Sequence, residues 1–283
     1  MFETRRLNDK KKVIVTAALT GAVTTKKDNP NLPTQPAEII KSALACYEAG
    51  ASAVHIHVRN EDDSASMRYD RFEEIVTGIR KTGCPVILNL TSSGGQGFSW
   101  DERIKPFKEL KPELASFDAG TMNWLNRVVF MNEPGFLEQC GKEMIASGVK
   151  PEIEIFDMGM LNTAKYYLKT GILQAPAHFQ LCLGAPGGME ATTENLLYLV
   201  NHLPEDCTWS AFGIGKGSNE VMLAALALGG NIRVGLEDNV YYNAGQLAES
   251  NEQFIGRIKR IAGEVGRTVA TPSEAREILG ISK

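Results

Sequence analysis

Short apolar runs alternate along the chain with stretches in which apolar residues recur at helical spacing. Eight runs rich in β-branched and aromatic residues predict strands, at 13–21, 53–59, 85–92, 114–120, 151–157, 178–184, 208–215 and 232–239. The stretches between them predict helices, at 36–50, 70–83, 134–146, 163–169, 193–202, 218–228 and 251–264, with a last short helix after Thr271 and Pro272. Strand and helix therefore alternate along the whole chain.

This alternation has two common solutions, a closed barrel and an open doubly wound sheet. No GxGxxG follows the first predicted strand, as would be usual in a dinucleotide-binding open sheet. Polar residues also lie at the ends of many strands, whereas an open sheet gathers its ligands at one switch point. The pattern favours an α/β protein with the (β/α)8 TIM barrel fold. Because no linker or change of composition interrupts it, we expect one domain over 1–283, with a short N-terminal lead-in and a C-terminal helix.

Composition and charge narrow the class of protein. The 283 residues are 43% hydrophobic and 23% charged, as in ordinary globular domains, and the net charge of -4 argues against non-specific nucleic-acid binding. The N-terminus has no signal-peptide pattern, and the best apolar run, 13–23, is half the roughly 20 residues of a membrane helix. Five scattered cysteines without a CxxC pair indicate reduced thiols. We therefore expect a cytoplasmic protein that binds neither nucleic acid nor membrane.

The segment AVHIHVR in the second predicted strand holds the first candidate site. His55 and His57 stand two residues apart, so their side chains leave the same face of the strand. Val54, Ile56 and Val58 leave the other face, which a barrel packs against its helices. Both imidazoles therefore point inward, where they can bind one metal ion. The alternative is a pair of buried histidines that hydrogen-bond to their neighbours.

The last predicted strand, NIRVGLEDN, supplies a third ligand. Arg233, Gly235 and Glu237 share one face, and this strand adjoins the first strand in a closed barrel. Glu237 therefore comes within two strands of the histidines. Two imidazoles and one carboxylate suit zinc and leave a position open for water or substrate, as in catalytic sites. Asp238 either caps the following turn or serves as a base that Arg233 orients.

Other strand ends carry further polar side chains. Thr91 and Ser93 share a face of VILNLTSSGG, and Gly94 lets the backbone approach a ligand closely. Ser116 shares a face of the fourth strand with Asp118. We expect these strand ends to line the same site.

Glu152 and Glu154 alternate with isoleucines in the fifth strand, so both carboxyl groups can point into the barrel. Because a buried acid without a partner is costly, we expect Glu154 to contact a metal or a cation, or to act as a base. Glu152 can instead pair with a lysine at the barrel floor. His178 and His202 lie at a strand start and on a helix, and both are interpreted as structural.

Two glycine-rich loops, LGAPGGM and FGIGKGS, follow the sixth and seventh strands and contain Gly187, Gly188, Gly215 and Lys216. The second loop leads into a helix, whose free N–H groups favour an anion. TIM barrels often bind phosphate in this region. The two loops together suggest a phosphorylated ligand or a coenzyme A thioester, although ordinary turns have the same pattern.

The motifs TAALTGAVTT, HIHVR, PEIEIFDMG, LGAPGGM and GLEDN, in this order, resemble those of the β-keto acid cleavage enzymes. The resemblance extends from about Val13 to TPSEAREIL near the C-terminus. It implies a zinc-dependent barrel that converts a β-keto acid and acetyl-CoA to acetoacetate and a new acyl-CoA. It also implies a homotetramer.

The resemblance assigns roles residue by residue. The zinc ligands fall on His55, His57 and Glu237, and the pair that abstracts a proton falls on Arg233 and Asp238. The residues that position the substrate fall on Thr91, Ser116 and Glu154. Members that accept an amino-substituted substrate have TGAE where this chain has TGAV, so Val23 replaces an acid and favours a substrate side chain without positive charge.

The hypothesis is that zinc polarises the β-keto acid, Asp238 removes a proton, and the carbanion attacks acetyl-CoA. The phosphates of acetyl-CoA would lie over the loops around Gly187 and Lys216. A zinc-dependent aldolase or hydrolase is one alternative, because it would use the same three ligands without a thioester. A non-catalytic metal-binding barrel is the other.

Overall fold

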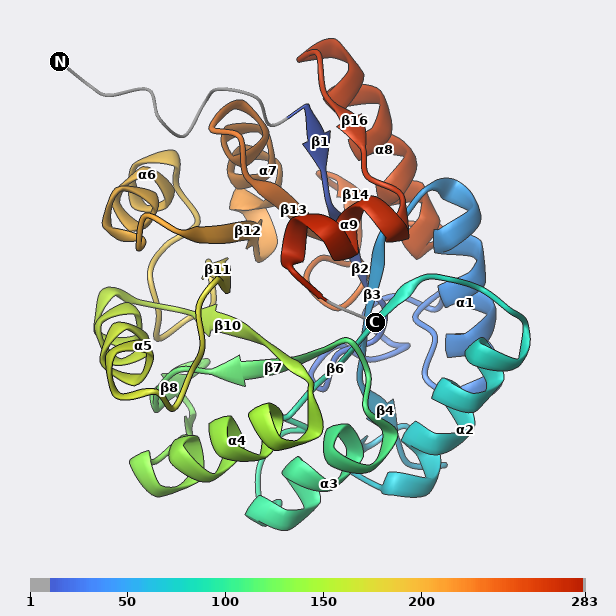
Figure 1. Ribbon diagram of the computed structural model, residues 1–283. Helices are drawn as coiled ribbons and strands as arrows, with labels where there is room; N and C mark the ends of the chain where they lie inside the picture. Colours follow the sequence, from blue (N-terminus) through green and yellow to red (C-terminus); the bar gives the residue numbers. More distant parts are fainter. Residues whose placement is uncertain (1–10, 282–283) are drawn as a thin grey trace, which may run out of the picture.

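The computed structural model describes residues 11–281 and shows a closed barrel of parallel strands (Figure 1). The barrel consists of β2 (Val15–Ala18), β3 (Ala53–Ile56), β6 (Ile87–Leu90), β7 (Leu114–Asp118), β10 (Lys150–Ile155), β11 (Ala177–Leu183), β12 (Cys207–Gly213) and β13 (Asn231–Val234). Each of these strands overlaps one predicted run, so the TIM barrel is confirmed. Most strands end earlier than predicted, because the polar residues after them belong to loops.

Pairing between β13 and β2 closes the barrel. Arg233 lies opposite Thr16 in this parallel pair, and Ala18 lies opposite His55 in the pair of β2 and β3. The carboxyl ends of β13, β2 and β3 are therefore neighbours. This places Glu237, which follows β13, on the same side of the barrel as His55 in β3 and His57 just after it.

Helices surround the barrel (Figure 1). They are α1 (Pro36–Ala49), α2 (Tyr69–Lys81), α3 (Trp100–Leu110), α4 (Pro134–Ser147), α5 (Met158–Thr170), α6 (Thr193–His202), α7 (Ser218–Ala227), α8 (Asn251–Glu264) and α9 (Pro272–Leu279). In α1, Pro36 stands in the first turn and Gly50 ends the helix in the left-handed conformation. Apolar side chains between strands and helices form the main core.

Two helices differ from the prediction. The predicted helices do not include α3, whose interior contains Pro106, a residue that usually ends a helix. A capping box between Ser99 and Glu102 starts α3 and compensates for part of this cost. The structure also begins α5 at Met158, earlier than predicted, because the Asp157 side chain accepts a hydrogen bond from the backbone N–H of Met160.

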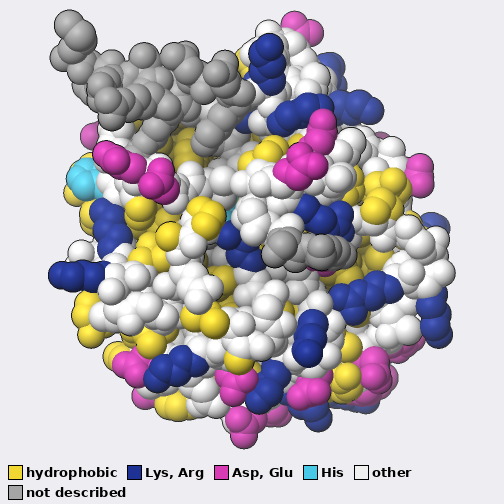
Figure 2. Space-filling model, viewed as in Figure 1, with side chains coloured by type: hydrophobic (Ala, Val, Ile, Leu, Met, Phe, Trp, Pro, Cys, Tyr) yellow, Lys and Arg dark blue, Asp and Glu magenta, His cyan; other side chains and the backbone are white. Residues whose placement is uncertain are grey.

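The two ends of the barrel differ. α9 covers the end at which the strands begin, where Ala275 and Leu279 pack against Ile14, Ile87 and Leu114. Figure 2 shows this side of the molecule, with positive and negative side chains interspersed over the surface in view. The opposite end, at which the strands finish, remains available for a site.

Short two-stranded sheets extend from the barrel. They pair β1 (Lys12–Val13) with β16 (Thr268–Val269), β4 (Val58–Arg59) with β5 (Ala65–Ser66), β8 (Met122–Trp124) with β9 (Val128–Phe130), and β14 (Tyr241–Asn243) with β15 (Gln246–Leu247). The predicted strands do not include the hairpin of β8 and β9. Most of the predicted N-terminal lead-in, residues 1–10, lies outside the described residues. No helix within 11–281 combines the length and the apolar character of a membrane span.

Candidate active site

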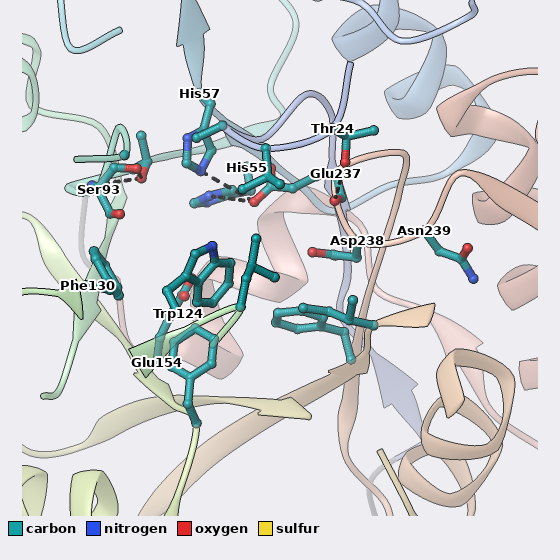
Figure 3. A pocket seen from close by; sticks show the side chains of 18 of the residues that line it. Thr24, His55, His57, Ser93, Trp124, Phe130, Glu154, Glu237, Asp238 and Asn239 are labelled. Atoms are coloured by element: carbon teal, nitrogen blue, oxygen red, sulfur yellow. Dashed lines mark hydrogen bonds and ion pairs between the residues drawn. The ribbon is translucent and has the colours of Figure 1, made fainter. Parts of the chain in front are cut away.

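A cavity of about 450 Å³ lies at the carboxyl ends of the barrel strands (Figure 3). The predicted site residues that line it are His55, His57, Glu237, Arg233, Asp238, Glu154, Thr91, Ser93, Ser116, Val23 and Gly215. Its lining does not include Gly94, Gly187, Gly188 or Lys216. The barrel therefore brings most of the predicted residues into one cavity.

His55, His57 and Glu237 form a compact group of metal-binding side chains, with one ligand atom from each within 4.8 Å of the others. The Nε2 atoms of His55 and His57 lie 3.6 Å and 3.4 Å from Oε1 of Glu237. Donor atoms that surround one zinc ion tetrahedrally are about 3.4 Å apart. The three side chains therefore have the spacing of a metal site.

The hydrogen bonds of the two histidines leave part of each imidazole without a partner. The Nδ1 atoms of His55 and His57 have no hydrogen-bond partner among the described residues. The distances from Nε2 to Glu237 also exceed the usual N–H···O range of about 2.7–3.2 Å. Burial lowers the pKa of His55 well below its ordinary value, so its imidazole is neutral and can donate a lone pair. The residues present therefore fit a divalent cation.

Two glycines bring the Glu237 carboxylate to the histidines. A Cβ atom on Gly235 would lie 2.0 Å from the carbonyl oxygen of Ala18, so only glycine lets this segment approach β2. Gly21 is in the left-handed region, with φ of 65°, and a Cβ there would lie 2.6 Å from Cγ of Glu237. The glycine of TGAV therefore makes room for the third ligand.

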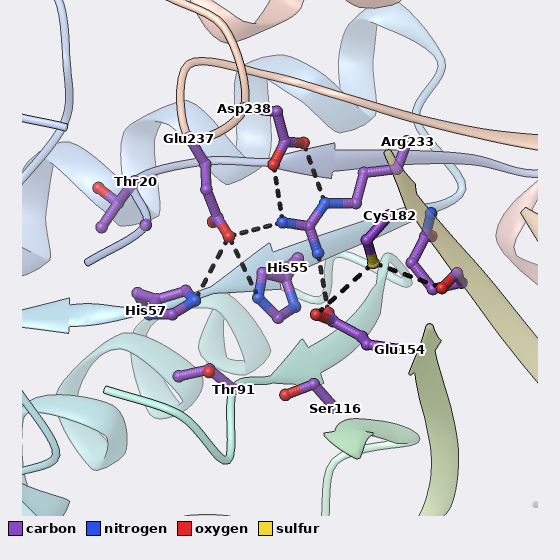
Figure 4. Close-up of polar contacts among 12 residues, drawn as sticks. Thr20, His55, His57, Thr91, Ser116, Glu154, Cys182, Arg233, Glu237 and Asp238 are labelled. Carbon is purple, nitrogen blue, oxygen red and sulfur yellow. Dashed lines mark hydrogen bonds and ion pairs between the residues drawn. The ribbon is translucent and has the colours of Figure 1, made fainter. Parts of the chain in front are cut away.

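Arg233 is buried beside this group and contacts three carboxylates (Figure 4). Its Nε and Nη2 atoms donate to the two carboxylate oxygens of Asp238 at 3.0 Å and 2.9 Å. Nη1 donates to Glu154 at 3.2 Å, and Nη2 also donates to Glu237 at 2.6 Å. This two-pronged contact fixes the Asp238 carboxylate beside the metal-binding group.

Burial changes the protonation of the acids around Arg233. It raises the pKa of Asp238 to about 6, although the guanidinium opposes the change. Burial, and then the nearby charge of Asp118, raise the pKa of Glu154 well above its ordinary value. Burial opposes ionisation of Glu237 as well, but neighbouring positive charges keep the pKa of this group low. Burial therefore disfavours the charged forms of Glu154 and Asp238, whereas Glu237 stays ionised beside them.

The sequence profile of the beta-keto acid cleavage enzymes matches residues 12–281. The chain belongs to this family. A 3-keto-5-aminohexanoate cleavage enzyme of Acetoanaerobium sticklandii is 42% identical over 273 residues, covering 96% of this chain and 99% of that protein. A 3-dehydrocarnitine:acetyl-CoA trimethylamine transferase of Rhizobium meliloti is 36% identical, covering 98% of this chain and 99% of that protein. The predictions of the family and of an enzyme are both confirmed.

Solved structures agree with the barrel fold of this family member. The apo structure of ObcA superposes on the chain with a TM-score of 0.79, at 20% sequence identity. The match covers 90% of this chain and 66% of that chain. The two proteins therefore share their fold.

The predicted hydroxyl residues of this cleavage enzyme hold the backbone beside the cavity. Thr91 Oγ1 donates to the carbonyl oxygen of Ser93 at 2.8 Å and accepts from its N–H at 2.9 Å. Ser116 accepts a hydrogen bond from the backbone N–H of Ser92 at 3.0 Å. Gly94 packs against Met67, outside the cavity lining. Substrate binding by these residues stays a prediction.

The first glycine-rich loop contacts protein backbone. A Cβ on Gly187 would lie 2.0 Å from the carbonyl oxygen of Asn123, and one on Gly188 would lie 2.8 Å from that of Phe156. Gly187 therefore allows the loop after β11 to pack closely against the β8–β9 hairpin, and Gly188 allows it to pack against the segment after β10. Their predicted contact with acetyl-CoA stays a prediction.

The second loop lies beside the first, as predicted. The N–H of Ile214 donates to the carbonyl oxygen of Leu183 at 2.8 Å. A short 3-10 turn, η1 (Gly215–Gly217), then leads into α7 and carries Lys216 on the surface. An anion at this turn likewise stays a prediction.

The sequence predicts Asp118 at the site without an assigned role, and it does not predict the aromatic residues of the β8–β9 hairpin there. Asp118 is buried, lines the cavity and lies opposite Glu154 in the pairing of β7 and β10. Its position on the same face of the strand as Ser116 indicates from the sequence that Asp118 faces the cavity. Trp124 and Phe130 come from the β8–β9 hairpin, for which the sequence gives no clear turn signal.

Proposed function

We propose that this enzyme is zinc-dependent and converts a β-keto acid and acetyl-CoA to acetoacetate and a new acyl-CoA. The single observation that carries the proposal is the group of His55, His57 and Glu237 beside the Arg233–Asp238 pair, in a chain of this family. Names of relatives that include acetyl-CoA support the co-substrate. Zinc at the three ligands would supply a Lewis acid that polarises the ketone and stabilises an enolate.

The residues of this chain would hold and transfer the proton. Asp238, fixed by two hydrogen bonds from Arg233, accepts a proton from C2 of the β-keto acid. Glu154 orients the same guanidinium from the other side, at 3.2 Å. Asp238 then returns the proton to C2 of the acetoacetate enolate, so that the enzyme ends in its starting state.

The reaction transfers two acyl groups, and every carbon atom of the substrates appears in the products. The C2 carbanion attacks the acetyl carbonyl, and the coenzyme A thiolate leaves. The thiolate then adds to the original keto carbon, C3, and the C2–C3 bond breaks. The electron pair of that bond stays on C2, which gives acetoacetate after protonation, while the original acyl group leaves as its thioester.

Val23 supports a substrate whose side chain carries no positive charge. It lines the cavity with 53% of its surface exposed and offers no counter-ion. The relative from Acetoanaerobium sticklandii is named for an amino-substituted β-keto acid. We therefore propose the same reaction with a different side chain. The scattered cysteines support a cytoplasmic location, and the family resemblance supports a homotetramer.

An exchange experiment tests this function without knowledge of the natural substrate. Acetoacetate is a product for every β-keto acid, so the enzyme must bind it. With acetyl-CoA labelled by carbon-13 in the acetyl group and unlabelled acetoacetate, the zinc-loaded enzyme should transfer label into acetoacetate. An aldolase or hydrolase would consume β-keto acid without acetyl-CoA. Bound zinc without exchange, and without any acyl-CoA product from other β-keto acids, would reject the proposal.

A further inference from the structure

The cavity lining includes a group of apolar side chains, most of them from the β8–β9 hairpin and the turn between its strands. We name this group the apolar wall; its members are Val23, Trp124, Leu125, Val128, Phe130 and Phe156. Figure 3 shows Trp124 and Phe130 below the two histidines in that view, with Asp238 and Asn239 to the right. A ligand held at the metal-binding group is therefore faced by polar side chains on one side and by aromatic rings on another.

The rings of the apolar wall hold one another in place. Trp124 makes edge-to-face contacts with Phe130 and Phe156, with ring centroids 6.0 Å and 5.7 Å apart. The guanidinium of Arg103 also lies over the Phe130 ring, 5.8 Å from its centroid. A wall held in this way is ready to receive a ligand without rearrangement.

The hairpin that carries the wall is fastened to the barrel at several points. The N–H of Leu125 donates to the carbonyl oxygen of Pro186 at 2.9 Å. Arg103 donates to the carbonyl oxygen of Met131 at 3.0 Å, and Gln96 donates to that of Val129 at 2.9 Å. These contacts reach the hairpin from α3 and from the loops after β6 and β11, so its position relative to the site is fixed.

The turn of the β8–β9 hairpin places two residues in a backbone conformation that is unfavourable for one of them. Leu125 and Asn126 both adopt the left-handed conformation, with φ of 56° and 55°. Asparagine tolerates this region, but leucine adopts it rarely and at a cost of roughly 1–3 kcal/mol. The contacts of the hairpin maintain this conformation, which places the Leu125 side chain in the cavity lining. Strain of this kind is typical of segments that shape a binding site.

We propose that the apolar wall binds the C3 side chain of the β-keto acid, and that the enzyme selects a branched aliphatic or aromatic side chain without charge. This inference rests on the proposed function. The apolar wall excludes water from such a side chain and thereby favours it. The arm of coenzyme A is a poorer occupant, because its amides would lose hydrogen bonds to water against a wall of apolar side chains.

Two pairs of substrates isolate the charge of the side chain from its shape. The first pair is 5-methyl-3-oxohexanoate and 3-keto-5-aminohexanoate, which differ by a methyl group in place of an ammonium group. The second is 5,5-dimethyl-3-oxohexanoate and 3-dehydrocarnitine, which differ by carbon in place of quaternary nitrogen. We expect the neutral member of each pair to have the higher kcat/KM by about tenfold or more, as for a well-fitted apolar group.

The second pair also tests a competing use of the rings, because aromatic side chains can bind quaternary ammonium groups by cation–π attraction. A preference for 3-dehydrocarnitine over its neutral analogue would overturn the inference. Equal kcat/KM values within both pairs would overturn it too. Labelled acetyl exchange into acetoacetate, run in parallel, reports the proposed function itself, so that failure of selectivity alone is distinguished from failure of the whole reaction.

Variants of Trp124 connect selectivity to the wall. Trp124→Ala should lower the ratio of kcat/KM for 5-methyl-3-oxohexanoate to the acetoacetate exchange rate by about tenfold. Trp124→Phe should restore part of this ratio, and it guards against misfolding of the alanine variant. Trp100→Ala is the matched control, because Trp100 packs against Phe136 outside the cavity lining.

The Michaelis constant for acetyl-CoA gives the deciding readout. If Trp124→Ala raises this constant and leaves the ratio between β-keto acids as in the wild type, the wall contacts coenzyme A and the inference is wrong. If the ratio falls while the constant for acetyl-CoA stays near its wild-type value, the wall binds the side chain of the β-keto acid.

Discussion

The two sides of the cavity are built differently. The polar side consists of residues on or just after barrel strands, whose positions follow from the pairing of β13, β2 and β3. The apolar wall is carried mainly by the β8–β9 hairpin and the loop with Val23, outside the barrel. The ladder of backbone hydrogen bonds constrains the first side, whereas the second can change with the sequence of the loops. We therefore expect changes on the polar side to affect the reaction and changes in the loops to affect its selectivity.

The loop with Val23 is nevertheless firmly held. Arg59, the last residue of HIHVR, is buried and donates to the carbonyl oxygens of Gly21 and Thr24, both at 2.7 Å. The motif that contains the two predicted metal ligands therefore also fixes the loop that brings Val23 to the cavity lining. We expect selectivity in this region to depend on which side chain the loop carries at Val23, more than on how the loop moves.

The largest effect is expected from loss of a metal ligand on the polar side. His55→Ala should remove bound zinc and reduce acetyl exchange by more than the roughly 100-fold that loss of an outer hydrogen-bond partner costs a metal site. Metal analysis after dialysis, with the exchange assay, measures both. His202→Ala is the control, because His202 lies half-buried on α6, outside the cavity lining. Full zinc content and exchange in His55→Ala would show that the strands do not carry the metal-dependent chemistry.

A smaller effect separates the base from the metal. Asp238→Asn keeps the shape of the side chain but removes the proton acceptor, so kcat should fall by about 10²- to 10⁴-fold. Zinc content should stay near that of the wild type, because the three predicted ligands remain. Exchange of deuterium from solvent into C2 of acetoacetate measures proton transfer directly. Unchanged deuterium exchange would exclude Asp238 as the base.

A substitution at Val23 tests whether the loops can change substrate selectivity while the polar side keeps the reaction rate. Val23→Glu should raise kcat/KM for 3-keto-5-aminohexanoate relative to 5-methyl-3-oxohexanoate by up to about fivefold, because a half-exposed ion pair contributes up to about 1 kcal/mol. Competition between the two substrates in one reaction measures this ratio by mass spectrometry.

Val129→Glu is the matched control for this substitution. Val129 is 50% exposed, close to the 53% of Val23, but its side chain is outside the cavity lining. An equal change of the substrate ratio in both variants would mean that the added charge acts at long range. In that case Val23 would not define the selectivity of the site.

The polar side of the site could be predicted from the sequence because its pattern is local. Alternation along the segment of β3 and the residue after it points His55 and His57 inward, and the closure of any barrel brings Glu237 to them. The hairpin could not be predicted, since Leu125 and Asn126 form its left-handed turn without a glycine. Its position depends on contacts that are distant in sequence, such as the carbonyl oxygen of Pro186.

Gly187 shows that contacts distant in sequence also limit the prediction within a glycine-rich motif. A glycine-rich loop after a barrel strand predicts an approach of backbone to phosphate. In the structure the close neighbour of Gly187 is the carbonyl oxygen of Asn123 in the hairpin. A glycine in such a motif indicates close approach of a neighbouring group to the backbone. The sequence alone does not determine whether that group belongs to a ligand or to the protein. The helix α3 was missed for a related reason, because Pro106 argues locally against it and packing with α4 supports it.

The smallest effect concerns a carboxyl group below the site, on the same face of β10 as Glu154. Glu152 is fully buried, accepts a hydrogen bond from Asn89 at 2.6 Å and lies 3.7 Å from Nε2 of His178. No lysine contacts it among the described interactions, so the alternative of a lysine partner is not supported. Burial raises the pKa of Glu152 from its ordinary 4.5 to about 7. Between these values the folded state keeps a proton that the unfolded state has lost.

The free energy of unfolding should therefore fall as pH rises from 4.5 to 7, the range set by the pKa of Glu152, and then level off. The slope from this group is at most about 1.4 kcal/mol per pH unit. Glu152→Gln cannot lose a proton, so urea unfolding across this range should show a flatter dependence than in the wild type. Parallel curves would mean that Glu152 is ionised in the folded protein. Because Glu152 lies outside the cavity lining, acetyl exchange should change little, which would separate the structural acid of β10 from the one that faces the substrate.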